Sequence, residues 1–225
     1  IELRDSKYIN SLKFSAKYLL SLINDVLSLS KIESEKIELV FEDFNLKNEL
    51  ETIVNSLEVI ANKYHNVILI NFDLNVPQFI KSDKTRLSQI IMNLLSNALK
   101  FTKNGTINIY VYTNNNNTLN FEIIDTGIGI SYEFIDKIFD KFVQVDSNSD
   151  DQFQGTGLGL AIVKRFIEAL SGNIQIKSEI NKGTSVKFSI PLILGKETTE
   201  TYLNNNINTL QNLNVLVVDD NKVNQ

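Results

Sequence analysis

The chain has 225 residues, of which 43% are apolar and 22% charged, so it is long enough and hydrophobic enough to fold around a core. Its 22 Lys and Arg against 27 Asp and Glu give a formal net charge of -5, which argues against binding along a nucleic-acid backbone. The absence of Cys and the single His exclude disulfides, thiolate catalysis and metal cages built from those residues.

No stretch approaches the ~18 consecutive apolar residues that a membrane span needs. We therefore expect a cytoplasmic module without membrane contact of its own, whether or not the parent protein is anchored in a membrane. The chain starts at Ile1 instead of Met and stops soon after an apolar run, so we expect it to be a piece of a longer protein.

The first segment, residues 1–36, has the pattern of one long helix that extends to about Lys31. Its apolar positions are spaced three and four residues apart, as in a heptad seam: Ile9, Leu12, Ala16, Leu19, Ile23 and Val26. No second helix of this type is present in the chain, so the pattern predicts a homodimer formed through this helix. Packing along the following domain is the alternative.

A second domain is expected over residues 37–194, because the spacing of the apolar residues changes there from that of a helix to that of a strand. Ile37, Leu39 and Phe41 alternate with polar residues and predict a strand. The later patterns predict an α+β fold, a two-layer α/β sandwich. The predicted helices extend over Leu46 to Lys63, Asp83 to Leu99, Ser131 to Phe139 and Leu158 to Ala169. The predicted strands extend over Val67 to Phe72, Thr106 to Thr113, Leu119 to Ile124, Ile174 to Ile180 and Val186 to Ile190.

The C-terminal part of the chain predicts a linker and the start of a third domain. Residues 195–212 are polar and lack periodicity, which is typical of a linker. Within residues 213–225, the apolar run from Val215 to Val218 predicts a buried strand that ends in Asp219 and Asp220. This pattern indicates another α/β domain, truncated here.

Three clusters are candidates for chemistry, and the first lies on the helix that starts near Asp83. Asn93 and Asn97 are four residues apart on one face of that helix and Lys100 follows them. Amide oxygens can bind a hard cation such as Mg²⁺, and a lysine can reach phosphate oxygens. Solvated side chains on an exposed helix face are the alternative.

The second and third clusters are rich in glycine. Asp125 to Ile130 (D-T-G-I-G-I) follows an apolar strand, where a carboxylate can accept a hydrogen bond from an amine such as that of adenine. Gly155 to Leu160 (G-T-G-L-G-L) opens a helix whose N-terminus can favour an anion. The spacing of these glycines differs from that of the phosphate loop of NTPases and from that of the dinucleotide-binding fingerprint. Each glycine run, taken alone, also fits an ordinary turn.

Taken together, the order of these clusters resembles the catalytic ATP-binding domain of sensor histidine kinases, which share an ATPase superfamily with gyrase and chaperone ATPases. Its N box matches Asn93 to Thr102, its F box matches Phe139 to Phe142, and its two glycine boxes match the clusters above. Leu22 to Glu33 resembles the second helix of the dimerisation and phosphotransfer domain. Leu216 to Asn221 resembles the start of a receiver domain, as in a hybrid kinase.

The resemblance implies a role for each matching residue. Asn97 would bind Mg²⁺ and act in catalysis with Lys100, and Asn93 would lie beside the phosphates. Asp125 would read the adenine amine. The remaining residues implied at the ATP site are Gly127, Gly129 and Ile130 around the base, Phe139 and Phe142 at the lid, and Gly155, Thr156, Gly157, Leu158, Gly159 and Leu160 at the phosphates.

Other implied features concern the parent protein. Asp219 and Asp220 would hold Mg²⁺ in the receiver domain. The phosphoacceptor His of the family lies on a helix that would precede this chain, and His65 stands at the entry to a strand, so we expect His65 to be a surface residue. A core role for Phe139 and Phe142, instead of a role at the lid, remains an alternative.

The chain departs from the family before the second glycine box, where relatives often carry Arg and Lys. Residues 140–156 contain four Asp and one Lys, a net charge of -3. The loss of one charge-assisted hydrogen bond to phosphate costs roughly 1.5–3 kcal/mol, so an acidic lid should weaken ATP binding unless other cations compensate. The alternative is a mobile lid whose acidic side chains point into water.

From these motifs we expect the core of an ATP-dependent hybrid sensor histidine kinase. It would transfer the γ-phosphoryl group of Mg-ATP to a His on the missing phosphotransfer helix, and from there to an Asp of its own receiver domain or to a downstream response-regulator protein. A degenerate nucleotide-binding or docking module is the first alternative. An ATP-hydrolysing clamp of the gyrase or chaperone kind is the second.

Overall fold

The computed structural model describes residues 38–114, 117–144 and 156–197. Within these ranges the elements are β1 (Glu42–Asn45), α2 (Leu46–Lys63), β2 (Val67–Phe72), β3 (Phe79–Ser82), α3 (Lys84–Phe101), β4 (Thr106–Thr113), β5 (Thr118–Asp125), α4 (Tyr132–Ile135), α5 (Gly159–Ala169), β6 (Asn173–Glu179) and β7 (Gly183–Pro191). The predicted N-terminal helix, the strand over Val215 to Val218 and most of the predicted linker lie outside the described residues.

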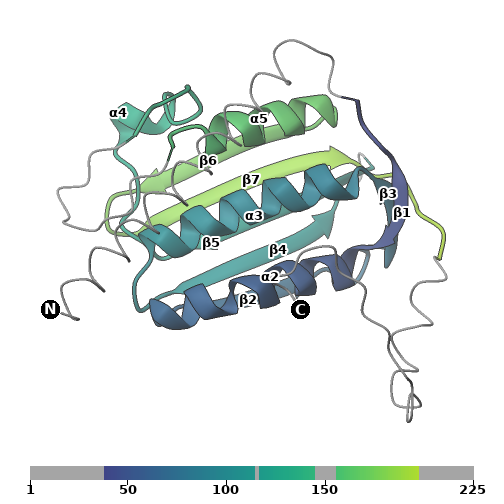
Figure 1. Ribbon diagram of the computed structural model, residues 1–225, viewed down its shortest axis with the longest axis horizontal. Coiled ribbons are helices and arrows are strands. Elements are labelled where there is room, and N and C mark those ends of the chain that lie inside the picture. The colour runs from purple at the N-terminus through teal and green to yellow at the C-terminus, as the bar shows by residue number, and fades with distance from the viewer. Residues whose placement is uncertain (1–37, 115–116, 145–155, 198–225) are drawn as a thin grey trace, which may run out of the picture.

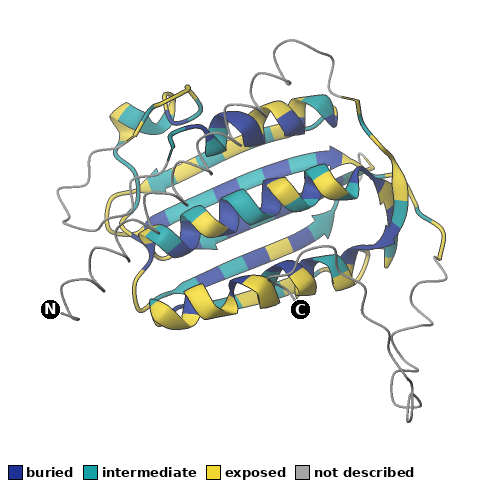
Figure 2. Ribbon diagram, in the orientation of Figure 1, coloured by how far each residue is buried: buried dark blue, intermediate teal, exposed yellow. Residues whose placement is uncertain are grey.

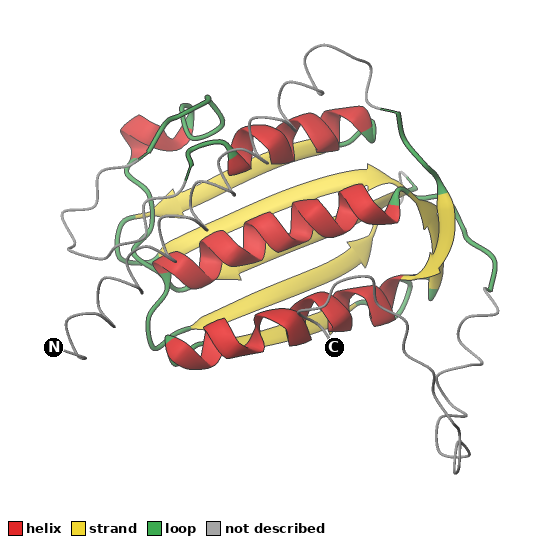
Figure 3. Ribbon diagram, in the orientation of Figure 1, coloured by secondary structure: helices red, strands yellow, loops and turns green. Residues whose placement is uncertain are grey.

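The main sheet has five strands in the order β2-β4-β5-β7-β6. β2 runs parallel to β4, and the other neighbouring pairs are antiparallel. Helices α2, α3 and α5 cover one face of this sheet, as Figures 1 and 3 show. The fold is therefore the two-layer α/β sandwich that the sequence predicted.

The core lies between the helices and the sheet because apolar residues alternate along the strands and recur at helical spacing. In Figure 2 the buried faces of the helices turn toward the sheet and the exposed faces turn to solvent. Phe121 of β5 and Phe188 of β7 are fully buried, and their rings stack with centroids 4.7 Å apart. Burial of apolar surface at roughly 25 cal/mol per Å² is the main force that holds the two layers together.

Helix α3 begins at a well-defined cap. The side chain of Asp83 accepts a hydrogen bond from the backbone N–H of Arg86 at 2.8 Å, which satisfies one of the free donors of the first turn. Its other carboxylate oxygen accepts from the N–H of Val40 at 3.0 Å. The chain segment that enters the domain is thus tied to the start of α3.

Three sequence predictions need correction. The strand predicted from Ile37, Leu39 and Phe41 is found at Glu42–Asn45, where the backbone pairs with β3, and Leu39 and Phe41 precede it. β3 itself was not predicted from the sequence. The helix predicted over Ser131 to Phe139 stops at Ile135, and tighter turns such as the bond from Lys137 N–H to Phe134 carbonyl follow it.

Candidate nucleotide-binding site

Asp125 ends β5 with its carboxyl group buried, at 8% exposure. Oδ1 accepts hydrogen bonds from the backbone N–H groups of Gly127, at 2.8 Å, and Thr184, at 3.2 Å. Burial raises the pKa of Asp125 above its ordinary value, and these two bonds and the Thr102 hydroxyl oppose the rise. A carboxylate held in this way can still accept a donor at Oδ2.

The first glycine turn is packed against two neighbouring segments. Gly129 has φ +70°, and a Cβ atom added there would lie 2.0 Å from the carbonyl oxygen of Glu179, so only glycine fits against the end of the β6–β7 hairpin. Ile130 donates its N–H to Ser178 Oγ at 2.8 Å. At Gly127 the added atom would lie 2.4 Å from the carbonyl oxygen of Phe101, which brings the turn to the end of α3.

Helix α3 brings the predicted polar residues toward these turns. Asn93, Asn97 and Lys100 are all partly buried on its C-terminal half. Asn93 donates Nδ2 to the carbonyl oxygen of Gln89 at 3.3 Å, and its Oδ1 lies 3.1 Å from the position that a Cβ atom would take at Gly159. The amide oxygen of Asn93 therefore faces the first turn of α5.

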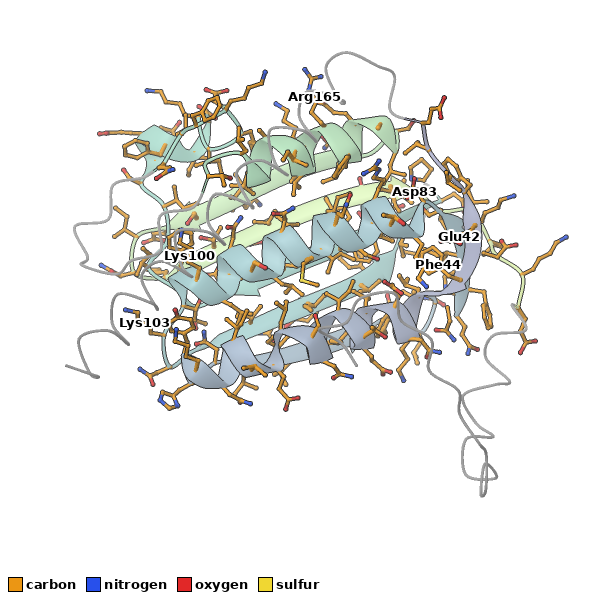
Figure 4. All side chains as sticks on the ribbon, in the orientation of Figure 1. Glu42, Phe44, Asp83, Lys100, Lys103 and Arg165 are labelled. Atoms are coloured by element: carbon orange, nitrogen blue, oxygen red, sulfur yellow. The ribbon has the colours of Figure 1, made fainter. Side chains whose placement is uncertain are left out.

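Lys100 lies near the C-terminal end of α3, and Figure 4 shows it close to Lys103 and far from Asp83. Its Nζ is 4.8 Å from the centroid of the Phe101 ring. Burial lowers the pKa of Lys100 below its ordinary value. An anion at this end of α3 would favour the charged form of Lys100 and be attracted to it.

The second glycine turn pairs with the F-box segment. Gly157 has φ +71° and accepts a hydrogen bond at its carbonyl oxygen from Phe142 N–H at 3.0 Å. A Cβ atom added at Gly157 would lie 2.8 Å from Phe142 Cα. Thr156 Oγ1 accepts from the N–H of Leu158, whose side chain is fully buried. Leu160 packs partly buried against the core.

The two F-box phenylalanines differ in their surroundings. Phe139 is partly buried, and Lys164 Nζ of α5 lies 5.7 Å from its ring centroid. Phe142 is 64% exposed, so it has no core role. Of the other predicted site residues, Gly155, Asp219 and Asp220 lie outside the described residues.

The described residues contain few further candidate positions for a metal ion or a ligand. No group of three His, Asp or Glu side chains within the described ranges could hold a metal ion. A shallow groove of about 580 Å³ runs from Glu42 and Glu49 along α3 to Ser96, and of the predicted site residues it contains Asn93. The assignment of the site therefore depends on the convergence of side chains and turns. No helix of the described part is long and apolar enough to cross a bilayer.

Three contributors to this site were missed in the sequence. Thr184 supplies a donor to Asp125, Thr102 lies beside the same carboxyl group, and Asn66 binds the end of α3. Asn66 Nδ2 donates to the carbonyl oxygen of Thr102 at 2.7 Å. Thr102 closes the N box, but no local pattern marks its contact or the other two residues, since each acts on a residue far away in the sequence.

A two-layer sandwich with a buried carboxylate beneath glycine turns, next to a helix bearing amides, defines an ATP-binding domain of the ATPase class. Comparison with protein families makes this specific: the chain belongs to the family of Histidine kinase-, DNA gyrase B- and HSP90-like ATPases, whose model matches residues 82–194.

Curated relatives confirm the resemblance to hybrid sensor kinases. The chain is 37% identical over 200 residues to hybrid signal transduction histidine kinase B of Dictyostelium discoideum, covering 86% of this chain and 10% of that protein. It is 37% identical over 226 residues to the autoinducer 2 sensor kinase/phosphatase LuxQ of Vibrio vulnificus, covering 97% of this chain and 26% of that protein. The chain thus spans about a quarter or less of these relatives.

Solved structures support the fold. Full-length ShkA in complex with AMPPNP matches with a TM-score of 0.76 and 30% identity, covering 85% of this chain and 40% of that chain. The histidine kinase AdeS of Acinetobacter baumannii matches with a TM-score of 0.68 and 25% identity, covering 82% of this chain and 83% of that chain. The described domain is therefore homologous to the ATPase domains of two-component sensor kinases.

Proposed function

We propose that the domain binds Mg-ATP along the C-terminal half of α3 and serves as the catalytic domain of a hybrid sensor histidine kinase. One observation carries the proposal: the buried carboxylate of Asp125 and the first turn of α5 both border the half of α3 that bears Asn93, Asn97 and Lys100. The AMPPNP bound to ShkA agrees with this assignment.

The base would be held by Asp125. Its Oδ1 is engaged by two backbone N–H groups, so Oδ2 accepts the hydrogen bond of the exocyclic amine. The turns at Gly127 and Gly129, with Ile130, bring the backbone close to the flat ring. A carboxylate accepts the amine of adenine and repels the oxo group of a 6-oxopurine, which gives a preference for ATP.

The phosphates would lie between α3 and the first turn of α5. Asn93 and Asn97 carry amide oxygens, which are ligands that a hard cation accepts, and the bond from Asn93 Nδ2 to Gln89 leaves Oδ1 facing the first turn of α5. Bound Mg²⁺ would supply charge neutralisation of the triphosphate. Lys100 would attract the γ-phosphate, and the residues from Thr156 to Leu160 would contribute backbone N–H groups.

In the parent protein, the γ-phosphoryl group would pass to a His on a phosphotransfer helix and then to an Asp of a receiver domain. Residues 1–36 would form the dimer helix, residues 195–212 a linker and residues 213–225 the start of the receiver, with Asp219 and Asp220 as its Mg²⁺ ligands. The similarity to a hybrid signal transduction histidine kinase supports this arrangement.

Binding of Mg-ATP to the 225-residue chain, measured by calorimetry, tests the proposal. We expect saturable binding that Asn97→Asp weakens and that the matched surface variant Asn55→Asp, on the exposed face of α2, leaves unchanged. The absence of heat and of any thermal shift at millimolar Mg-ATP would refute the proposal in favour of a docking module. In a longer chain with the phosphotransfer helix, acid-labile phosphate from labelled ATP should appear and be lost in Asn97→Asp.

A further inference from the structure

Thr102 presents an unusual polar atom at the C-terminal end of α3. Its side chain is fully buried, and its Oγ1 makes no hydrogen bond of good geometry with any described residue. Buried hydroxyl groups in proteins nearly always have a partner. The Thr102 hydroxyl is therefore available to a bound ligand or to a group that a ligand reorients.

The backbone of Thr102 is held in place by a buried amide side chain. Asn66, which is 5% exposed, donates Nδ2 to the carbonyl oxygen of Thr102 at 2.7 Å. The Oδ1 atom of Asn66 accepts from the N–H of Gly105 at 3.0 Å. These two hydrogen bonds link the start of β2 to the segment that follows α3 and fix where the backbone of Thr102 lies.

The hydroxyl faces the carboxyl group of Asp125. A Cβ atom placed on Gly127 would lie 2.8 Å from Thr102 Oγ1 and 2.8 Å from Asp125 Oδ1, so the two oxygens border the same small space. Among the described residues, the groups that act on the pKa of Asp125 are the Gly127 and Thr184 amides and the Thr102 hydroxyl, with no charged side chain.

We propose that Thr102 is a positioning residue for the purine site, whose hydroxyl donates to the Asp125 carboxylate when an adenine nucleotide binds. The inference rests on the proposed function above. A bound base removes water from a carboxylate that is already buried, which disfavours its charged form. A third donor offsets this loss and keeps Oδ2 as an acceptor for the amine.

Thr102→Val isolates the hydroxyl because it keeps the shape of the side chain. The ligand-free variant should unfold at about the same temperature, because Oγ1 makes no hydrogen bond of good geometry in the ligand-free domain. Its affinity for Mg-ATP should fall about tenfold at pH 7, the loss expected for one hydrogen bond to a charged group. The pH at which ATP affinity declines on acidification should rise, and the preference for ATP over ITP should shrink.

The controls separate a positioning role from a structural one. Thr102→Ser retains the hydroxyl and should restore ATP affinity, its pH profile and the base preference. Thr52→Val removes an exposed hydroxyl that donates to the Asn48 carbonyl oxygen on α2, at 2.8 Å, and should leave ATP binding unchanged.

The decisive experiment measures binding of ATP and ITP to the full chain and its variants from pH 5 to pH 8, with thermal unfolding of the ligand-free proteins. An unchanged affinity and pH profile in Thr102→Val would overturn the inference while leaving the proposed function intact. A Val variant that loses stability without ligand would overturn it too, because the hydroxyl would then be structural. If the unsubstituted chain binds neither nucleotide, the proposed function itself fails.

Discussion

Replacing Asp125 with Asn should change which purine the domain binds. In the structure Oδ1 accepts from the N–H groups of Gly127 and Thr184. An Asn side chain can satisfy both donors only with its carbonyl oxygen, which places its NH₂ group where Oδ2 was. The acceptor for the adenine amine becomes a donor, and that donor matches the oxo group of inosine.

The size of the effect follows from the bonds exchanged. Loss of a hydrogen bond to a charged group costs about 1.5–3 kcal/mol, which is roughly 10- to 150-fold in ATP affinity. A new neutral bond to ITP contributes about 0.5–1.5 kcal/mol, or roughly 2- to 10-fold. The preference for ATP over ITP should therefore fall by roughly 20-fold or more.

The same substitution should stabilise the ligand-free domain. Burial raises the pKa of Asp125 in the folded state, so the charged carboxylate opposes folding, and stability increases as the pH falls through this raised pKa. Asn cannot titrate, so the variant should be more stable at neutral pH and lose this dependence.

Calorimetric titration with Mg-ATP and Mg-ITP, together with thermal unfolding between pH 4 and pH 8, measures both effects. An ATP affinity within twofold of the unsubstituted chain would refute the placement of Asp125 at the base. Parallel losses for both nucleotides would refute the argument from hydrogen-bond direction.

Three further predictions concern the turns and the cation. Gly129→Ala should destabilise the domain by about 1–3 kcal/mol in urea unfolding, because φ is +70° and the Glu179 carbonyl oxygen blocks the Cβ atom; an unchanged midpoint would contradict this. Gly159→Ala should keep stability, since Ala favours helices by about 1 kcal/mol, yet weaken ATP binding in calorimetry by crowding Asn93 Oδ1 at 3.1 Å; undiminished affinity would show that α5 lies away from the phosphates. Lys100→Met should lower ATP affinity about 10- to 100-fold and spare adenosine in competition assays, whereas equal losses would assign Lys100 to the base.

Much of the fold was predictable because the signals are local. The bounds of α2 agree with the prediction, since Asn45 caps the helix by accepting from Asn48 N–H and the buried stripe from Leu46 to Ala61 has helical spacing. β3 was missed because it has four residues and no periodicity of its own. Its formation depends on pairing with β1 and with residues 193–195, which are remote in the sequence.

The site was predictable at the level of motifs but not of contacts. Asp125 and the glycine turns are recognisable because their backbone needs specific residue types. Thr184 donates to Asp125 across 59 residues, and Asn66 reaches Thr102 across 36, so no window of sequence reveals either bond. Asn66 is also one of 29 Asn residues, and nothing in its neighbours distinguishes it.

The two segments that flank the domain are attached at the start of α3 and on the strand before it, which has a mechanical consequence. Val40 is bonded to the cap of α3, and Ile193 and Gly195 are bonded to β3 immediately before it. α3 has 18 residues and is therefore ~27 Å long, with Lys100 at the opposite end. A tilt of α3 about this point of attachment would displace its Lys100 end by ~0.5 Å per degree.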